Sequence, residues 1–293
     1  MTVCQGAVSR RTRPPSAAGD SRFVCFARAA CRELTLIAAL FLFYKLARGL
    51  TADDVGLARQ NAERVLSWER WLHLPSEAAF QDAILEAPWL VEAANTFYAT
   101  VHFPVSIACV VWLFVRHRAH YRWMLTSIVV LTLSALVVHL TFPLAPPRMM
   151  AGFVDTGVVY GQSVYAGAAG RSANQIAAMP SLHVGWALLV ALALIRVLHT
   201  RWRWLALAHP TLTVLVVVAT ANHYWLDGIV AALMLAATLL VVSHATGGTR
   251  AREFAEGRRN DAGPRADQRW MALVSRNSSR PNLPPPRPVP DIS

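Results

Sequence analysis

The sequence predicts an all-α integral membrane protein with six transmembrane helices. Of its 293 residues, 55% are hydrophobic and only 15% are charged, whereas about a quarter of the residues of a soluble globular protein are charged. The mean hydropathy is +0.36, and the apolar residues gather in runs of about 20, the length that crosses a bilayer. This composition excludes a disordered, a collagen-like and a disulfide-framework protein.

Six apolar segments account for the prediction. In chain order they cover residues 32–50, 93–115, 122–144, 181–198, 204–221 and 223–244. We therefore expect a membrane domain over residues 32–245. It is flanked by a basic N-terminal tail (residues 1–31) and a Pro/Arg-rich C-terminal tail (residues 246–293). Both tails have the polar, Pro- and Arg-rich composition that is typical of disorder.

The charges of the connections predict the orientation of the chain. The net charge is +11. The arginines concentrate in the two tails and in the connections 116–122 and 196–203, which carry no acid. The connection 49–92 instead carries eight acids and three arginines. Since cytoplasmic connections are the positive ones, we expect a multi-pass cell-membrane protein with both termini in the cytoplasm. The same distribution favours membrane orientation over nucleic-acid binding.

The acidic connection contains a further helical pattern over residues 53–74. Its apolar residues, Val65 and Trp68 among them, alternate with charged ones such as Glu63 and Arg64. This pattern predicts an amphipathic helix that lies on the outer membrane surface or, equally, covers the outer loops.

Two short strings carry the residues that can do chemistry. Met179–His183 (Met-Pro-Ser-Leu-His) opens the fourth apolar segment, and His223–Asp227 (His-Tyr-Trp-Leu-Asp) opens the sixth. Arg148 follows the third segment. The orientation places all of them at the outer ends of helices three, four and six. Because ionisable residues are costly at membrane depth, their convergence indicates an active site on the extracytoplasmic face.

The residue types favour phosphoryl transfer. His223 and Asp227 are four residues apart, the spacing of a side-chain pair on one helix face. A carboxylate that orients one ring nitrogen leaves the other as a nucleophile. His183 can protonate a leaving oxygen. Ser181 stands at the N-cap of a helix, whose free N–H groups bind anions, and Arg148 grips phosphate in a bidentate way. Such a site works through a phosphohistidine intermediate without a metal or another cofactor.

The same strings resemble the second and third motifs of the type 2 phosphatidic acid phosphatase superfamily. Pro-Ser-Leu-His followed by His-Tyr-x-x-Asp is similar to its inositol phosphorylceramide synthase branch and the bacterial relatives of that branch. The resemblance implies a six-helix core and a metal-independent mechanism. It implies His223 as the nucleophile, Asp227 as its partner and His183 as the acid and base, with Arg148 and Ser181 on the phosphate. The implied substrate is a lipid phosphate, hydrolysed or transferred to an alcohol such as inositol.

Two cations of the common family pattern are missing. The Lys that the common pattern has six residues before its Arg is absent before Arg148, and Val217 occupies the position six residues before His223 where an Arg is usual. Arg171, in the connection between the third and fourth segments, is the candidate to replace one of them.

Six further polar residues are candidates for the headgroup site. Three recur at helical spacing in the second segment, and interhelical hydrogen bonding is their alternative role. Two precede the first motif string, where a turn is the simpler explanation, and the last stands directly before His223 and could orient it. The six are Asn95, Tyr98, His102, Asn174, Gln175 and Asn222.

Two other functions compete with phosphoryl transfer. His183, His223 and Asp227 supply three ligands for a membrane zinc hydrolase with an open fourth position. Arg148 and the helix start at Ser181 favour an anion over a cation and count against it. A non-enzymatic transporter or haem-binding bundle is the other alternative. Its weakness is that the histidines lie at helix ends and that no inverted repeat is visible.

Overall fold

A computed structural model of the chain describes residues 27–33, 35, 38–39, 42, 54–161 and 175–261, with residues 246–261 described by their backbone alone. Every named element in this part of the chain is a helix. The chain divides into two compact units, Met1–Leu239 and Leu240–Ser293. The first unit contains the helical bundle with all the motif residues, and the second contains the C-terminal part of the last helix.

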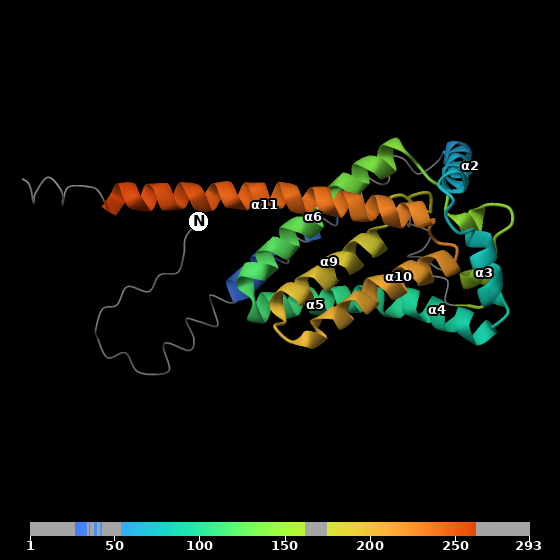
Figure 1. Ribbon diagram of the computed structural model, residues 1–293, viewed down its shortest axis with the longest axis horizontal. Helices are drawn as coiled ribbons and strands as arrows, with labels where there is room; N and C mark the ends of the chain where they lie inside the picture. Colours follow the sequence, from blue (N-terminus) through green and yellow to red (C-terminus); the bar gives the residue numbers. More distant parts are fainter. Residues whose placement is uncertain are drawn as a thin grey trace, which may run out of the picture. The chain divides into compact units, whose positions relative to one another are not determined.

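Figure 1 shows the helices of the bundle. In chain order they are α2 (Val55–Trp71), α3 (Glu77–Leu85), α4 (Pro88–Thr100), α5 (His102–Arg116), α6 (Arg118–Thr141), η1 (Pro147–Met149), α7 (Thr156–Val159), α9 (Leu182–Val197), η2 (Arg201–Leu207), α10 (Ala208–Ala219) and α11 (Trp225–Asp261).

Four helical stretches in the described part are long and apolar enough to cross a membrane. They cover Pro88–Arg116, Arg118–Thr141, Arg201–Ala219 and Trp225–Ala245. The predicted segment 181–198 is present as α9, which is apolar but shorter at 16 residues. Most of the predicted segment 32–50 lies outside the described residues. The membrane-type helical fold is therefore confirmed, and the count of six spans stays a prediction.

Several predicted helix ends differ from those of the structure. α6 ends at Thr141 rather than at 144, since the residue before Pro143 is disfavoured in the helical conformation. α11 begins at Trp225 rather than at 223, because a turn precedes it. The predicted boundary at 245 is not a helix end: α11 continues to Asp261, in a stretch whose Ala, Arg and Glu residues favour helix.

α9 lies at the centre of the bundle. It packs against α5, α6 and α10, and its buried residues Leu189, Val190 and Ala193 join the main hydrophobic core. Gly185 permits the close approach of α6, because a Cβ at this position would lie 3.0 Å from Cδ2 of Leu131. The central helix is thus held from several sides at the end where the Met179–His183 string opens it.

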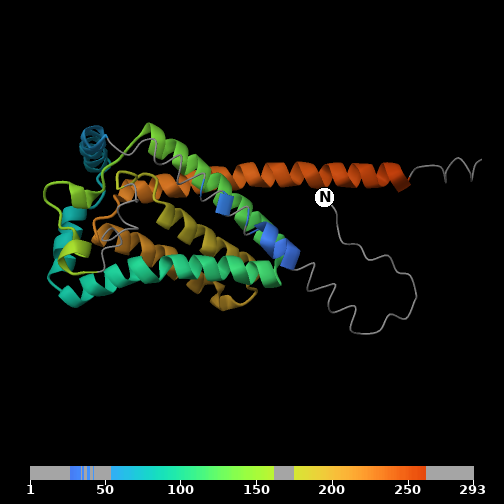
Figure 2. The same ribbon diagram turned by 180° about the vertical axis from the view of Figure 1, so that it is seen from behind.

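The predicted amphipathic helix is present as α2 and covers the loops. Both α2 and α3 lie at the end of the bundle where α4, α9 and α11 begin (Figures 1 and 2). One face of α2 buries Ala58, Ala62 and Val65 in a core shared with Leu144 and Tyr224. The opposite face exposes Trp71, 76% of whose surface is accessible. The outer connection is therefore a packed layer of the fold.

A buried glutamine joins α3 to two other segments. The Gln81 side-chain amide donates to the backbone oxygens of Val154 and Ala219 at 3.0 and 3.2 Å. Its oxygen accepts from the Val154 N–H at 2.9 Å. Gln81 is only 1% exposed, so water cannot replace these hydrogen bonds without opening the packing.

We expect Gln81→Leu to lower the free energy of unfolding by about 1–3 kcal/mol, because it strands the buried polar groups of Val154 and Ala219. Thermal unfolding of the full chain in detergent measures the effect. Gln60→Leu, on the exposed face of α2, is the matched control with an unchanged unfolding temperature. Equal temperatures for the two variants would contradict the bridging role of Gln81.

Candidate active site

Three backbone segments meet at the end of the bundle where α9 and α11 begin. The Leu144 N–H donates to the Ile176 oxygen at 2.8 Å, and the Ala178 N–H donates back to the Leu144 oxygen at 3.2 Å. The Arg148 N–H donates to the oxygen of Ala221, the residue before Asn222, at 2.9 Å. These hydrogen bonds join the segment after α6, the segment before α9 and the turn before α11.

The turn before α11 has an unusual backbone conformation. Ala221 has a φ of +53°, in the left-handed region that residues with a side chain seldom adopt. The N–H groups of Asn222 and His223 both donate to the Val217 oxygen, at 2.9 and 3.1 Å. The turn therefore folds back on the end of α10 and delivers His223 just before α11 begins.

Both hydrogen bonds of the His223 ring go through Nδ1. This nitrogen lies 2.8 Å from the Ala178 backbone oxygen and 3.2 Å from Oδ2 of Asp227. A carbonyl oxygen only accepts, so Nδ1 carries the proton in the neutral ring and Nε2 keeps its lone pair. His223 is 7% exposed and Asp227 is fully buried. The Ala178 oxygen is a positioning group that sequence patterns do not reveal.

The pair forms across a helix start and not on one helix face. His223 lies before the helix, and Asp227 stands in its first turn. Oδ2 of Asp227 also accepts the Tyr224 N–H at 2.9 Å, the return hydrogen bond of a capping box. The expected helical i, i+4 geometry is wrong here, although the pairing itself is present. A single carboxylate thus caps α11 and orients the His223 ring.

Ser181 and His183 occupy the positions that the sequence predicted. Ser181 is the N-cap of α9, and its hydroxyl accepts the Val184 N–H at 3.4 Å. Its own N–H donates to the Asp227 backbone oxygen at 3.2 Å. The His183 ring lies edge-on to the His223 ring with 5.6 Å between the centroids. The imidazole of α9 and the imidazole of the turn before α11 therefore meet at the N-terminus of α9.

Arg148 is held beside this pair by two acceptors. Its Nη1 donates to Oδ1 of Asn222 at 2.8 Å, and its Nε lies 3.6 Å from Oδ2 of Asp155. Asn222 in turn donates to the Thr220 hydroxyl at 2.8 Å. Asn222 therefore positions the guanidinium, a different role from the headgroup contact considered for it. Asp155 was missed, although it is the one acid between Arg148 and Arg171 in the sequence.

The three polar residues of the second predicted segment divide into two groups. Tyr98 and His102 lie against the His183 ring, with centroid separations of 4.8 and 5.0 Å. Asn95 instead bonds the loop near α7, exchanging hydrogen bonds with Thr156 at 2.8 and 2.9 Å. Tyr98 and His102 thus form the wall around His183, and Asn95 holds the loop.

The remaining candidates lie before α9. Arg171 and Asn174 fall outside the described residues. Gln175 is exposed in a turn. The core of the site therefore consists of Arg148 and the two histidines, with Asp227 beneath them.

The geometry does not favour a zinc site. Within the described ranges, no three His, Cys, Asp or Glu side chains are arranged to hold a metal ion. Oδ2 of Asp227 and Nδ1 of His223 bond to each other and so are not both directed at a cation.

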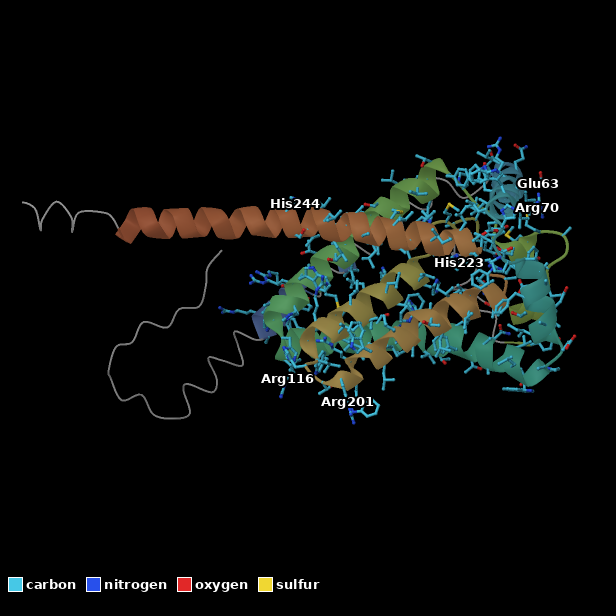
Figure 3. The ribbon with its side chains drawn as sticks, viewed as in Figure 1. Glu63, Arg70, Arg116, Arg201, His223 and His244 are labelled. Atoms are coloured by element: carbon cyan, nitrogen blue, oxygen red, sulfur yellow. The ribbon has the colours of Figure 1, made fainter. Side chains whose placement is uncertain are left out.

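The site and the basic connections lie at opposite ends of the bundle. Figure 3 shows His223 at the same end as Glu63 and Arg70 of α2, and Arg116 and Arg201 at the other end. The membrane orientation drawn from the charges of the connections stays a prediction.

Comparison with known proteins identifies one family. A family model described as the PAP2 superfamily matches residues 63–241, more than half of the chain and all of the site just described. No curated protein and no solved structure matches the chain.

We expect neutral His223 to be the tautomer with the proton on Nδ1, because the Ala178 oxygen at 2.8 Å requires a donor. Imidazole ¹⁵N chemical shifts of histidine-labelled protein distinguish the two tautomers, and the spectrum of His223→Gln assigns the resonance. A proton on Nε2 would contradict this geometry.

Proposed function

The chain belongs to the PAP2 superfamily of phosphatases and phosphotransferases, and on that premise we propose that it cleaves a phosphoester bond of a lipid through a covalent phosphohistidine on His223. The observation that carries the proposal is the orientation of the His223 ring. Hydrogen bonds from Nδ1 to Ala178 and Asp227 leave the Nε2 lone pair for attack on phosphorus.

The first step forms a bond between Nε2 of His223 and phosphorus as the bond from phosphorus to the lipid oxygen breaks. The leaving oxygen takes a proton from protonated His183, whose ring lies 5.6 Å from that of His223. Asp227 stabilises the positive charge that the imidazole gains, because its carboxylate lies 3.2 Å from Nδ1. A buried carboxylate stabilises this positive charge more strongly than an exposed one does, because electrostatic interactions are stronger in the protein interior than in water.

The second step releases the phosphoryl group. Water or an alcohol attacks phosphorus, its proton passes to His183, and the bond to Nε2 breaks, which restores both histidines. Hydrolysis and transfer thus need the same residues and differ only in the acceptor. The resemblance of the Pro-Ser-Leu-His string to the inositol phosphorylceramide synthase branch supports transfer to a polyol, with inositol as the first acceptor to test.

Phosphate binding falls to the positive groups around the histidines. The Arg148 guanidinium is fixed by Asn222 and Asp155, and a fixed guanidinium suits the oxygens of a phosphoryl group. The N-terminus of α9 adds the free N–H groups of its first turn behind Ser181. These groups would also stabilise the charge that builds up on the phosphoryl oxygens in the transition state. No metal or other cofactor takes part in the proposed mechanism.

We place this chemistry on the extracytoplasmic face of the cell membrane. Arg116 and Arg201 lie at the bundle end opposite His223 (Figure 3), and arginine-rich connections favour the cytoplasmic side. The substrate is then a lipid phosphate of the outer leaflet, and both chain termini lie in the cytoplasm.

We expect wild-type protein, assayed in detergent with a metal chelator present, to release phosphate from one or more members of a panel of lipid phosphates. His223→Ala should lower the rate by a factor on the order of 10⁴ or more, the scale of loss when a nucleophile is removed. His183→Gln should lower the chemical step by about 10²–10⁴-fold. The exposed His244 supplies the control, and His244→Ala should retain wild-type turnover.

The outcome also separates the acceptors. Phosphate release without an alcohol identifies hydrolysis, and a labelled headgroup product formed only with added inositol identifies transfer. Wild-type turnover by His223→Ala would contradict the assignment of the nucleophile. Loss of wild-type activity on chelation would contradict metal-independent chemistry.

A further inference from the structure

Two glutamates of the outer connection bond directly to the start of α11. Oε1 of Glu69, on α2, accepts the Leu226 N–H at 2.8 Å. Oε1 of Glu77, on α3, accepts the Trp225 N–H at 3.3 Å. Together with Asp227, which accepts the Tyr224 N–H, three carboxyl groups satisfy three successive backbone donors. A helix start usually has a Ser, Thr, Asp or Asn cap, and α11 has these acids instead.

The two glutamates share a buried environment without a cation. Each is only 3% exposed, and within the residues that the structure describes neither forms an ion pair with a basic side chain. Their carboxyl groups accept the N–H groups of two neighbouring residues, Trp225 and Leu226, and therefore lie close together. Two ionised carboxylates so close in a buried site would repel each other, which favours the protonation of one of them. Burial, with the neighbouring Glu77 carboxyl, raises the pKa of Glu69 to about 9.

We propose that Glu69 and Glu77 are positioning residues, a carboxyl–carboxylate pair that shares one proton and holds the first turn of α11, with His223 and Asp227, against the outer connection. The pair gives the start of α11 two hydrogen-bond acceptors while it carries only one negative charge. A second charge would lie close to Asp227, in a region where repulsion is weakly screened. The shared proton therefore lets three acids crowd one helix start.

The groups around Glu69 make its ionisation the change that raising the pH produces in the pair. The titratable groups that face it are Glu77 on α3, Asp227 on α11 and Tyr224 in the turn. Burial raises the pKa of the Tyr224 phenol, and its hydroxyl donates to the Ala145 oxygen at 3.0 Å, so Tyr224 stays neutral at alkaline pH. Ionisation of Glu69 would set two carboxylates against each other and push α2 and α3 away from α11.

Glu69→Gln tests the shared proton directly. A glutamine amide donates permanently to Glu77, as the protonated carboxyl does, and its oxygen still accepts from Leu226. Glu69→Ala removes both bonds. Glu63, exposed on the same helix and labelled in Figure 3, supplies the control Glu63→Gln.

The first measurement is the unfolding temperature of the full chain in detergent between pH 5 and pH 10. With a folded pKa near 9 and an ordinary value of 4.5, folded wild type binds more protons than the unfolded chain in this window. The contribution of Glu69 to stability therefore falls as pH rises and levels off above about 9. We expect the unfolding temperature of Glu69→Gln minus that of wild type to rise from pH 5 to about pH 9 and then to level off. The same difference for Glu63→Gln should stay flat, and Glu69→Ala should be unstable throughout.

The second measurement is turnover against pH, for the activity proposed above. Wild-type kcat should fall above pH 9 as His223 loses its support, and Glu69→Gln should keep turning over there. If no substrate is turned over, the proposed function has failed, while the unfolding temperatures still decide on the pair. A flat difference between Glu69→Gln and wild type, or a glutamine variant as unstable as the alanine variant at neutral pH, would overturn the shared proton.

Discussion

The hydrogen bonds of one fully buried carboxylate, that of Asp227, organise the outer end of the bundle. Its Oδ2 accepts from Nδ1 of His223 and from the Tyr224 N–H, and its backbone oxygen accepts from the Ser181 N–H. A buried carboxylate is costly unless such donors surround it. The His223 ring, the helix start and the segment before α9 therefore adopt one arrangement, in which donors that stabilise Asp227 belong to the groups that the proposed reaction needs in place.

The outer connection completes this arrangement and is not a simple tether. α2 packs on the segment around Leu144 and on Tyr224, and Asn61 donates to the Pro143 oxygen at 2.8 Å. α3 contributes Gln81, which joins the loop before α7 to the end of α10. Arg148 and His223 belong to the two backbone segments against which α2 and α3 pack. The positions of the Arg148 guanidinium and of the His223 ring thus depend on residues far from them in sequence.

The parts of the site that the sequence predicted are those in which residue type and local spacing suffice. Ser181 after Pro180 predicted an N-cap, and the two histidine strings predicted a meeting of α9 with α11. Their convergence with Arg148 followed from the order of the apolar segments. Local spacing placed the start of α11 two residues too early. The left-handed turn at Ala221 was not predicted, because such a turn is usually recognised by a glycine and none is present there.

Other features depended on tertiary packing and were not predictable in this way. The sequence around Glu69 and Glu77 is typical of charged residues on the solvent-exposed face of an amphipathic helix. In the structure each is only 3% exposed and contacts the start of α11. Nothing local distinguishes them from the exposed Glu63. Asn95 and Tyr98 share a helical stripe in the sequence, but the loop that bonds Asn95 and the histidine that contacts Tyr98 come from distant segments. Hydrophobic periodicity predicts which segments cross the membrane, whereas the partners of polar side chains emerge only from the fold.

The most direct measurement of the central claim is the trapping of the covalent intermediate. A lipid phosphate that wild-type protein turns over is mixed with it, quenched in the steady state under alkaline conditions that preserve phosphohistidine, and digested for mass spectrometry. The mechanism predicts a phosphoryl group on His223, which its ring orientation assigns to Nε2, and no label in His223→Ala. A phosphoryl group on Ser181 or His183, or steady turnover with no labelled residue, would contradict it.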